Sequence, residues 1–122
     1  MQRTPLISIV DDDESLRLAL VALVRSLGYR GESFSSAEEF LASGTAPRCA
    51  CIVTDIQMPG LSGIDLMLRL RQHGCTVPVI MVTARIETAL HDRALASGAL
   101  CLLKKPFDTQ ELIRCLERAL AP

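Results

Sequence analysis

Short apolar segments recur along the chain, at residues 6–10, 29–34, 50–54, 77–82 and 99–103. Four of them are apolar almost throughout, whereas the segment at 29–34 is weaker because it carries several polar residues. Segments of this length that are rich in Val, Ile and Leu are typical of strands buried on both faces of a sheet. The pattern therefore predicts five strands.

Longer segments with apolar residues at helical spacing follow each strand, at residues 14–27, 36–43, 64–74, 87–97 and 109–120. Gly28, directly after the first of them, is the residue type that most often ends a helix. Ser36 and Ser62 stand where helix N-caps are expected. The side chains expected to face the core are Leu16, Leu20, Leu23, Val24 and Leu27 in the first helix, Ile64, Met67, Leu68 and Leu70 in the third, and Leu112, Ile113, Leu116 and Leu120 in the last.

Strand and helix thus alternate from the start of the chain to its end. Two parallel strands need a helix-length connection, and right-handed connections place helices on both faces of the sheet. The alternation therefore predicts an α/β fold, a doubly wound five-stranded parallel sheet in one domain that spans residues 1–122. In such sheets ligands bind beyond the carboxyl ends of the strands, which makes the residues at those ends the candidate site.

Charged and hydroxyl side chains gather at the predicted strand ends: Asp11 and Asp12 follow the first strand, Asp55 the third, Thr83 the fourth and Lys105 the fifth. Three carboxylates at one edge of a sheet repel one another unless a cation lies between them. Hard oxygen ligands suit Mg²⁺, which takes one or two protein carboxylates together with waters and phosphate oxygens. A hydroxyl and an ammonium then supply the hydrogen bonds and positive charge that a phosphoryl group needs.

Four motifs surround these strand ends, and they read Ile9-Val10-Asp11-Asp12-Asp13, Val53-Thr54-Asp55-Ile56-Gln57-Met58-Pro59-Gly60, Met81-Val82-Thr83-Ala84 and Lys104-Lys105-Pro106-Phe107. In this order and at these separations they resemble the signature of the receiver domains of bacterial two-component response regulators, over nearly the whole chain. The resemblance implies a (βα)5 flavodoxin-like fold with strand order 2-1-3-4-5. The residues of these motifs resemble those of nitrogen-fixation-type transcriptional regulators, so we expect the chain to be the N-terminal part of a longer regulator.

The resemblance also implies roles for single residues. Asp55 would accept a phosphoryl group from a sensor histidine kinase, and Mg²⁺ would be bound by Asp11, Asp12, Asp55 and the backbone carbonyl of Gln57. Asp12 would bind the metal directly, whereas Asp11 would bind it directly or through a water molecule. The implied function is a signalling switch that assists its own phosphorylation and dephosphorylation but is not an enzyme acting on other substrates.

Two further residues would respond to the phosphoryl group. Thr83 would report its presence, and Lys105 would contact Asp55 or its phosphate, aimed by a cis peptide bond before Pro106. Leu102 departs from the family, whose receivers usually carry an aromatic switch residue three positions before the lysine. The rotation of an aromatic ring is therefore not expected in this chain.

Each candidate also has a purely structural interpretation. Asp11 and Asp12 could cap the following helix, but capping needs fewer acids than stand there, and Asp13 fits that role alone. Asp55 could simply begin a turn, Thr83 could end a strand, and a lysine could be solvated. The joint occurrence of these residues in register favours a functional site.

The cysteines indicate a compartment rather than a metal. Cys49, Cys51, His73 and Cys75 raise the question of zinc, but only one residue separates the members of each pair, where structural zinc sites prefer two to four. We interpret these cysteines as small buried hydrophobes. Five cysteines form an odd set scattered through apolar segments, which argues against a secreted disulfide framework and favours a reducing cytoplasm.

Charge and hydropathy exclude other partners. Thirteen basic and fourteen acidic residues leave a formal net charge of −1, so no direct binding of nucleic acid is expected. The sequence contains neither a signal peptide pattern nor the roughly 18 consecutive apolar residues of a membrane span. We expect a soluble cytoplasmic protein that does not bind a membrane.

Three functions stay open. The leading hypothesis is a two-component switch that controls an output domain outside this chain, expected to be transcriptional, and that could form a homodimer on phosphorylation. A Mg²⁺-dependent phosphatase with Asp55 as nucleophile would need a second acid nearby, and Gln57 is not one. A pseudo-receiver that serves only as an interaction module would not need an intact set of Asp55, Asp12 and Lys105.

Overall fold

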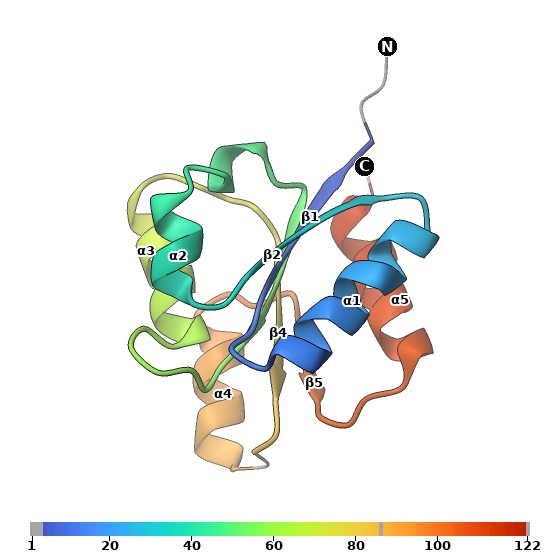
Figure 1. The fold of residues 1–122 in the computed structure, drawn as a ribbon. Helices are drawn as coiled ribbons and strands as arrows, with labels where there is room; N and C mark the ends of the chain where they lie inside the picture. Colours follow the sequence, from blue (N-terminus) through green and yellow to red (C-terminus); the bar gives the residue numbers. More distant parts are fainter. Residues whose placement is uncertain (1–3, 86, 122) are drawn as a thin grey trace.

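The computed structural model describes residues 4–85 and 87–121. Within them the strands are β1 (Leu6–Val10), β2 (Arg30–Phe34), β3 (Cys51–Asp55), β4 (Val79–Thr83) and β5 (Cys101–Lys104), and the α-helices are α1 (Glu14–Ser26), α2 (Ala37–Ala42), α3 (Gly63–Gln72), α4 (Thr88–Ala96) and α5 (Thr109–Leu120). The strands pair in parallel in the order β2-β1-β3-β4-β5 (Figure 1). The predicted doubly wound fold and its strand order are confirmed.

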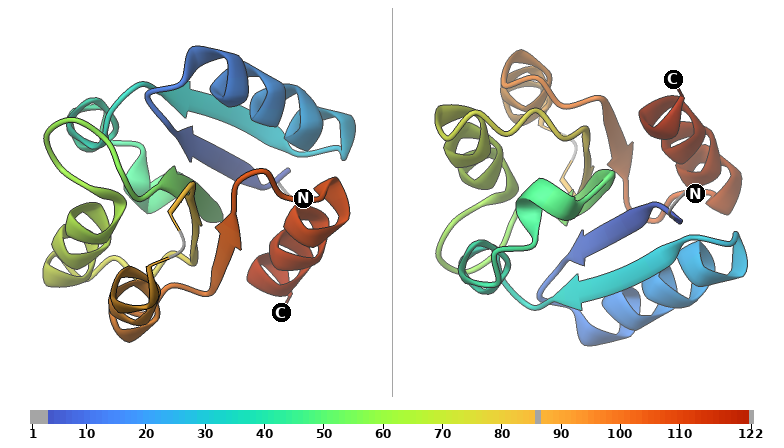
Figure 2. Two further views of the ribbon diagram at one scale, coloured as in Figure 1. Left: turned by 90° about the horizontal axis from the view of Figure 1, so that it is seen from below. Right: turned by 90° about the horizontal axis from the view of Figure 1, so that it is seen from above.

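Helices cover both faces of this sheet. Helices α1 and α5 lie on one face, and α2, α3 and α4 lie on the other (Figure 2), so the buried side chains form two cores. The apolar strands β1, β3 and β4 occupy the middle of the sheet, and their alternating side chains fill both cores. The largest fully buried side chains include Ile7, Ile9, Phe40, Ile52, Ile56, Leu66, Met67, Ile80, Met81, Leu112 and Leu116.

The last two strands begin and end later than predicted. The segment expected at 77–82 becomes a strand only at Val79, because Pro78 has no N–H to give to a neighbouring strand. At the other end, Thr83 pairs with Lys104 in the ladder between β4 and β5. Thr83, like Asp55, is therefore the last residue of its strand and not the first residue beyond it. A short 3-10 helix at Ala46–Arg48 was not predicted.

Two predictions of inward-facing leucines were wrong. Leu68 is 47% exposed, whereas Leu66, which was not predicted to face inward, is fully buried. Leu66 lies one turn before the buried Leu70, so the two share a face of α3. Leu27 follows the last turn of α1 and is 38% exposed. Closely spaced leucines offer more than one apolar stripe, and the position of the sheet decides which of them is used.

Helix caps and one glycine fix the loops around the sheet's carboxyl edge. The carboxylate of Asp13 accepts the Leu16 N–H at 3.2 Å, which confirms it as the cap of α1. The hydroxyl of Ser62 likewise caps α3. A Cβ at Gly63 would collide with the backbone carbonyl of Asp55, so only glycine allows α3 to start this close to the end of β3. The position of Asp55 is thereby held by the start of α3.

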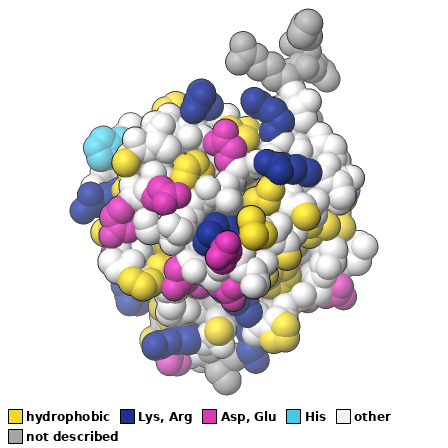
Figure 3. Space-filling view, in the orientation of Figure 1, with side chains coloured by type: hydrophobic (Ala, Val, Ile, Leu, Met, Phe, Trp, Pro, Cys, Tyr) yellow, Lys and Arg dark blue, Asp and Glu magenta, His cyan; other side chains and the backbone are white. Residues whose placement is uncertain are grey.

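The surface carries charges of both signs. On the face drawn in Figure 3, Lys and Arg side chains alternate with Asp and Glu side chains. A mixed surface of this kind provides no continuous basic stripe for a nucleic-acid backbone on that face. In the described part of the chain, no helix is long and apolar enough to cross a bilayer.

Candidate functional site

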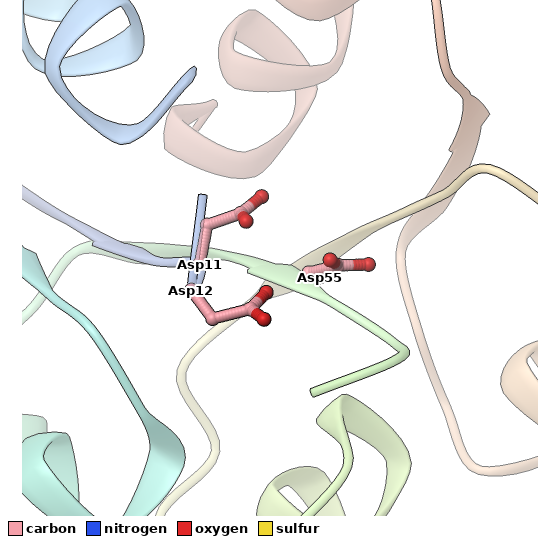
Figure 4. Close-up of side chains that lie close together, drawn as sticks. All are labelled: Asp11, Asp12 and Asp55. Carbon is pink, nitrogen blue, oxygen red and sulfur yellow. The ribbon is translucent and has the colours of Figure 1, made fainter. Parts of the chain in front are cut away.

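Three carboxylates meet at the carboxyl-terminal edge of the sheet. Asp11 and Asp12 follow β1, and Asp55 ends β3, which pairs with β1. One oxygen of each carboxylate lies within 4.8 Å of the others, and Figure 4 shows Asp11 and Asp12 projecting toward the side of Asp55. The parallel sheet thus brings together acids that lie far apart in the sequence.

Lys105 supplies a positive charge to this group. Its Nζ donates to Asp11 Oδ2 at 3.0 Å and to Asp55 Oδ2 at 3.1 Å. The side chains of Asp11 and Asp55 are only 1% and 9% exposed, so water screens these charges less than at the surface. The lysine was predicted to contact Asp55, whereas its contact with Asp11 was not predicted. The peptide bond between Lys105 and Pro106 is cis, as the resemblance implied.

Burial and charge act in opposite directions on this pair. Burial raises the pKa of Asp55 above the usual value of an aspartate, and the Lys105 ammonium offsets this only in part. Burial alone would lower the pKa of Lys105, but its hydrogen bond to Asp11 and the negative charge of Asp55 raise it overall. The lysine is therefore firmly cationic, while ionised Asp55 retains a desolvation cost that a bound cation would reduce.

The remaining oxygens of the cluster fit a hard divalent cation. Asp11 Oδ1 accepts the N–H of Asp13 at 2.9 Å, and Asp55 Oδ1 accepts the N–H of Gln57 at 3.3 Å. Asp12 is exposed, and no ion pair or hydrogen bond among the described residues engages its carboxylate. The carboxylates of Asp11 and Asp55 are fixed by hydrogen bonds, whereas that of Asp12 is exposed and free of them among the described residues. Such an arrangement suits Mg²⁺, which binds few protein carboxylates and keeps several of its waters. The cluster could therefore hold a metal ion.

Thr83 reaches the same edge but is not bonded to Asp55. Its hydroxyl donates to Gln57 Oε1 at 2.8 Å and accepts the N–H of Arg85 at 3.0 Å. The sequence interpretation assigned a role only to the backbone carbonyl of Gln57 and missed its side chain. No pattern in the sequence indicates this bond, because it depends on how the end of β4 lies relative to the loop after β3 and on side-chain rotamers.

Leu102 lies near Thr83 on the neighbouring strand. A pocket of about 250 Å³ is lined by both residues together with Arg85, His91 and Lys104. Leu102 is itself half-buried against the core under α2, α3 and α4. Open space therefore remains where the leucine stands in place of a larger aromatic side chain.

The cysteines and His73 do not form a metal centre. Among the residues that the structure describes, the aspartate cluster is the group with three ligand side chains close enough for one ion, and Cys49, Cys51 and Cys75 belong to no such group. The Sγ atom of Cys49 instead lies 2.8 Å from the hydroxyl of Ser8. All five cysteines are free thiols. The zinc alternative has no support in the structure.

The chain is similar to known signalling proteins. The family model of the response regulator receiver domain matches residues 7–117. The response regulator protein TodT of Pseudomonas putida is 36% identical over 118 residues, which are 97% of this chain and 52% of TodT. The transcriptional regulatory protein FixJ of Azorhizobium caulinodans is 35% identical over 114 residues, which are 93% of this chain and 54% of FixJ. The chain thus spans about half the length of these curated relatives.

The fold gives the same result. The crystal structure of the chemotaxis protein CheY4 of Vibrio cholerae matches with a TM-score of 0.87 at 27% identity, and the match covers 97% of this chain and 100% of that one. The family match, the related sequences and the strand order agree. The chain belongs to the response regulator receiver domain family of two-component systems.

Proposed function

We propose that this receiver accepts a phosphoryl group from a sensor histidine kinase on Asp55 and thereby works as a switch. The observation that carries the proposal is the meeting of Asp55 with Lys105, 3.1 Å away, and with the carboxylates of Asp11 and Asp12. Phosphoryl transfer requires a positioned nucleophile and compensating positive charge far more than covalent chemistry by the protein. This group of side chains provides the nucleophile, the ammonium and a place for a metal.

The proposed transfer is an in-line displacement. A carboxylate oxygen of Asp55 forms the new bond to phosphorus as the P–N bond to the kinase histidine breaks, and the electron pair of that bond stays on the imidazole. Lys105 then compensates charge on the phosphorylated carboxyl group, to which it is already hydrogen-bonded in the resting protein. Attack of water on the phosphorus of this acyl phosphate would release inorganic phosphate and reset the switch.

The proposed cofactor is Mg²⁺. Its ligands would be Asp11, Asp12, Asp55 and the backbone carbonyl of Gln57, with the unengaged Asp12 bound directly. When bound, the ion supplies the positive charge that lets an anionic phosphoryl group approach a site with three carboxylates.

The proposed partners follow from the length of the relatives. TodT and FixJ are about twice as long as the matched region, and FixJ is a transcriptional regulator. We therefore propose that residues 1–122 are the receiver part of a longer regulator, whose output domain controls transcription. The five free thiols suit a cytoplasmic location.

Incubation with acetyl phosphate and Mg²⁺ tests the function. We expect one phosphoryl group to appear per chain and to persist long enough for detection by intact-protein mass spectrometry. Rapid release of phosphate from many donors per chain, without accumulation of labelled protein, would instead identify a phosphatase. Absence of labelling would identify a pseudo-receiver, and either of these results would overturn the proposal.

Leu102 is expected to contribute little to switching. Burial of a whole leucine is worth about 1.5–3 kcal/mol, and a partial change in the exposure of Leu102 is worth much less. Leu102→Ala should therefore leave phosphorylation-dependent dimerisation within a few-fold of the parent, whereas Thr83→Ala should uncouple it. Sedimentation with and without beryllofluoride, a stable phosphoryl mimic, checks both variants. A Leu102→Ala protein that binds the mimic but never changes its association state would show that the leucine is the switch.

A further inference from the structure

The resting position of Thr83 is set by partners on two loops. Gln57, two residues after β3, accepts its hydroxyl proton at 2.8 Å, and the N–H of Arg85, two residues after β4, donates to the same oxygen at 3.0 Å. Thr83 is 4% exposed, so water does not readily replace these partners. We call the contact between the two side chains the Gln57–Thr83 latch.

Sheet geometry turns the threonine away from the phosphoacceptor. Side chains alternate along a strand, so Thr83 belongs to the same face of β4 as Val79 and Met81, which pack under α2, α3 and α4. Asp55 pairs with Val82, which packs under α1 and α5. Thr83 and Asp55 therefore project toward opposite faces at the edge of the sheet, and Gln57 offers the nearer acceptor.

A threonine hydroxyl has a single proton, so it cannot donate to Gln57 and to a phosphoryl oxygen at once. We propose that Gln57 is a positioning residue that holds Thr83 in its resting place. A phosphoryl group on Asp55 can accept the Thr83 hydroxyl only when the hydrogen bond from Thr83 to Gln57 breaks. This inference rests on the proposed phosphorylation of Asp55. It assigns the Gln57 side chain a role separate from that of its backbone carbonyl.

Release of the latch also changes the contacts of Arg85, two residues after β4. When the hydroxyl of Thr83 turns toward Asp55, the N–H of Arg85 loses the acceptor that it has in the resting protein. Arg85 is exposed, so its N–H can then bind water, and its backbone is no longer held to the end of β4 by Thr83. The latch therefore links the occupancy of Asp55 to the backbone at Arg85, without requiring a rotating aromatic ring.

Gln57→Met tests the latch, because methionine has nearly the same length but carries no carbonyl to accept the hydroxyl proton. Loss of a neutral hydrogen bond from the resting state should strengthen binding of beryllofluoride about two- to tenfold. The affinity is measured by titration at saturating Mg²⁺, so that differences in metal affinity do not enter. In the free variant, the methyl resonance of Thr83 should also shift toward its position in the beryllofluoride-bound parent.

A double-mutant cycle separates this role from a general structural effect. In a Thr83→Val background the hydroxyl is absent, so Gln57→Met should no longer change the affinity for the mimic. Gln72→Met, at an exposed position at the end of α3, makes the same substitution away from the site and should behave like the parent.

The outcomes distinguish the two proposals. If the parent binds beryllofluoride but Gln57→Met binds it no more tightly, the latch is wrong while the proposed function stands. An effect of Gln57→Met that persists undiminished in the Thr83→Val background would also overturn the latch. If the parent itself fails to bind the mimic, the proposed function is wrong, and the latch falls with it.

Discussion

Asp55→Asn is expected to abolish phosphate incorporation from acetyl phosphate or a kinase while the fold stays intact. Asparagine has the shape of aspartate, but its amide is not a nucleophile that could form an acyl phosphate. Lys105 keeps its hydrogen bond to Asp11 at 3.0 Å, so the substitution leaves no unpaired buried ammonium. Mass spectrometry of the intact protein after incubation measures the loss. Undiminished labelling of the variant would refute Asp55 as the acceptor.

Asp13→Asn is the matched control. Asp13 lies close to the cluster but caps α1, and asparagine caps a helix as well as aspartate does. The control should therefore label like the parent. Labelling lost in both variants would point to a general effect of removing negative charge and not to loss of the acceptor.

Asp55→Asn is also expected to change the thermal stability of the protein. Burial raises the pKa of Asp55 in the folded protein, so its ionised form opposes folding above that pKa. This cost disappears as the pH falls below the ordinary aspartate value of about 4. Without Mg²⁺, Asp55→Asn should therefore unfold at a higher temperature than the parent at neutral pH, and the difference should vanish near about pH 3. Thermal unfolding in EDTA across this range measures it.

Asp12→Ala is expected to weaken Mg²⁺ binding by about tenfold or more, because it deletes a charged oxygen ligand. Asp12 is the member of the cluster whose carboxylate is exposed and unengaged among the described residues, and an ion can bind it without displacing a protein partner. Calorimetric titration of the unphosphorylated protein with Mg²⁺ measures the affinity. Superimposable titration curves for variant and parent would contradict the ligand role.

Glu14→Ala separates direct ligation from long-range attraction. Glu14 is exposed in the first turn of α1, so its removal changes the net charge by the same amount without removing a predicted ligand. Attraction between exposed charges is weak in water and is screened by salt. The control should therefore change the Mg²⁺ affinity far less than Asp12→Ala does. Equal effects of the two substitutions would indicate that Asp12 acts through its negative charge alone and is not a ligand.

The sequence by itself determined the elements and the residues that stand at their ends. Apolar segments of strand length, alternating with helical spacing, predicted the parallel sheet, because burial on both faces requires apolar residues throughout a strand. Since parallel strands end at one edge, the same pattern predicted that Asp11, Asp12 and Asp55 lie together, as they do in the structure. Helix caps such as Ser62 were also predictable from the sequence, because their hydrogen bonds reach only three residues along the chain.

The tertiary structure alone decided which partners these residues take. Lys105 donates hydrogen bonds to Asp11 as well as to Asp55. The hydroxyl of Thr83 donates its hydrogen bond to Gln57 and not to Asp55. It also decided that Leu66 and not Leu68 faces the core, although both are apolar residues of one helix. A periodic pattern predicts which positions of a helix or strand share a face. A hydrogen bond between distant residues, in contrast, requires a donor–acceptor distance that is met to within a few tenths of an ångström. Those distances exist only after the strands and helices have packed against one another.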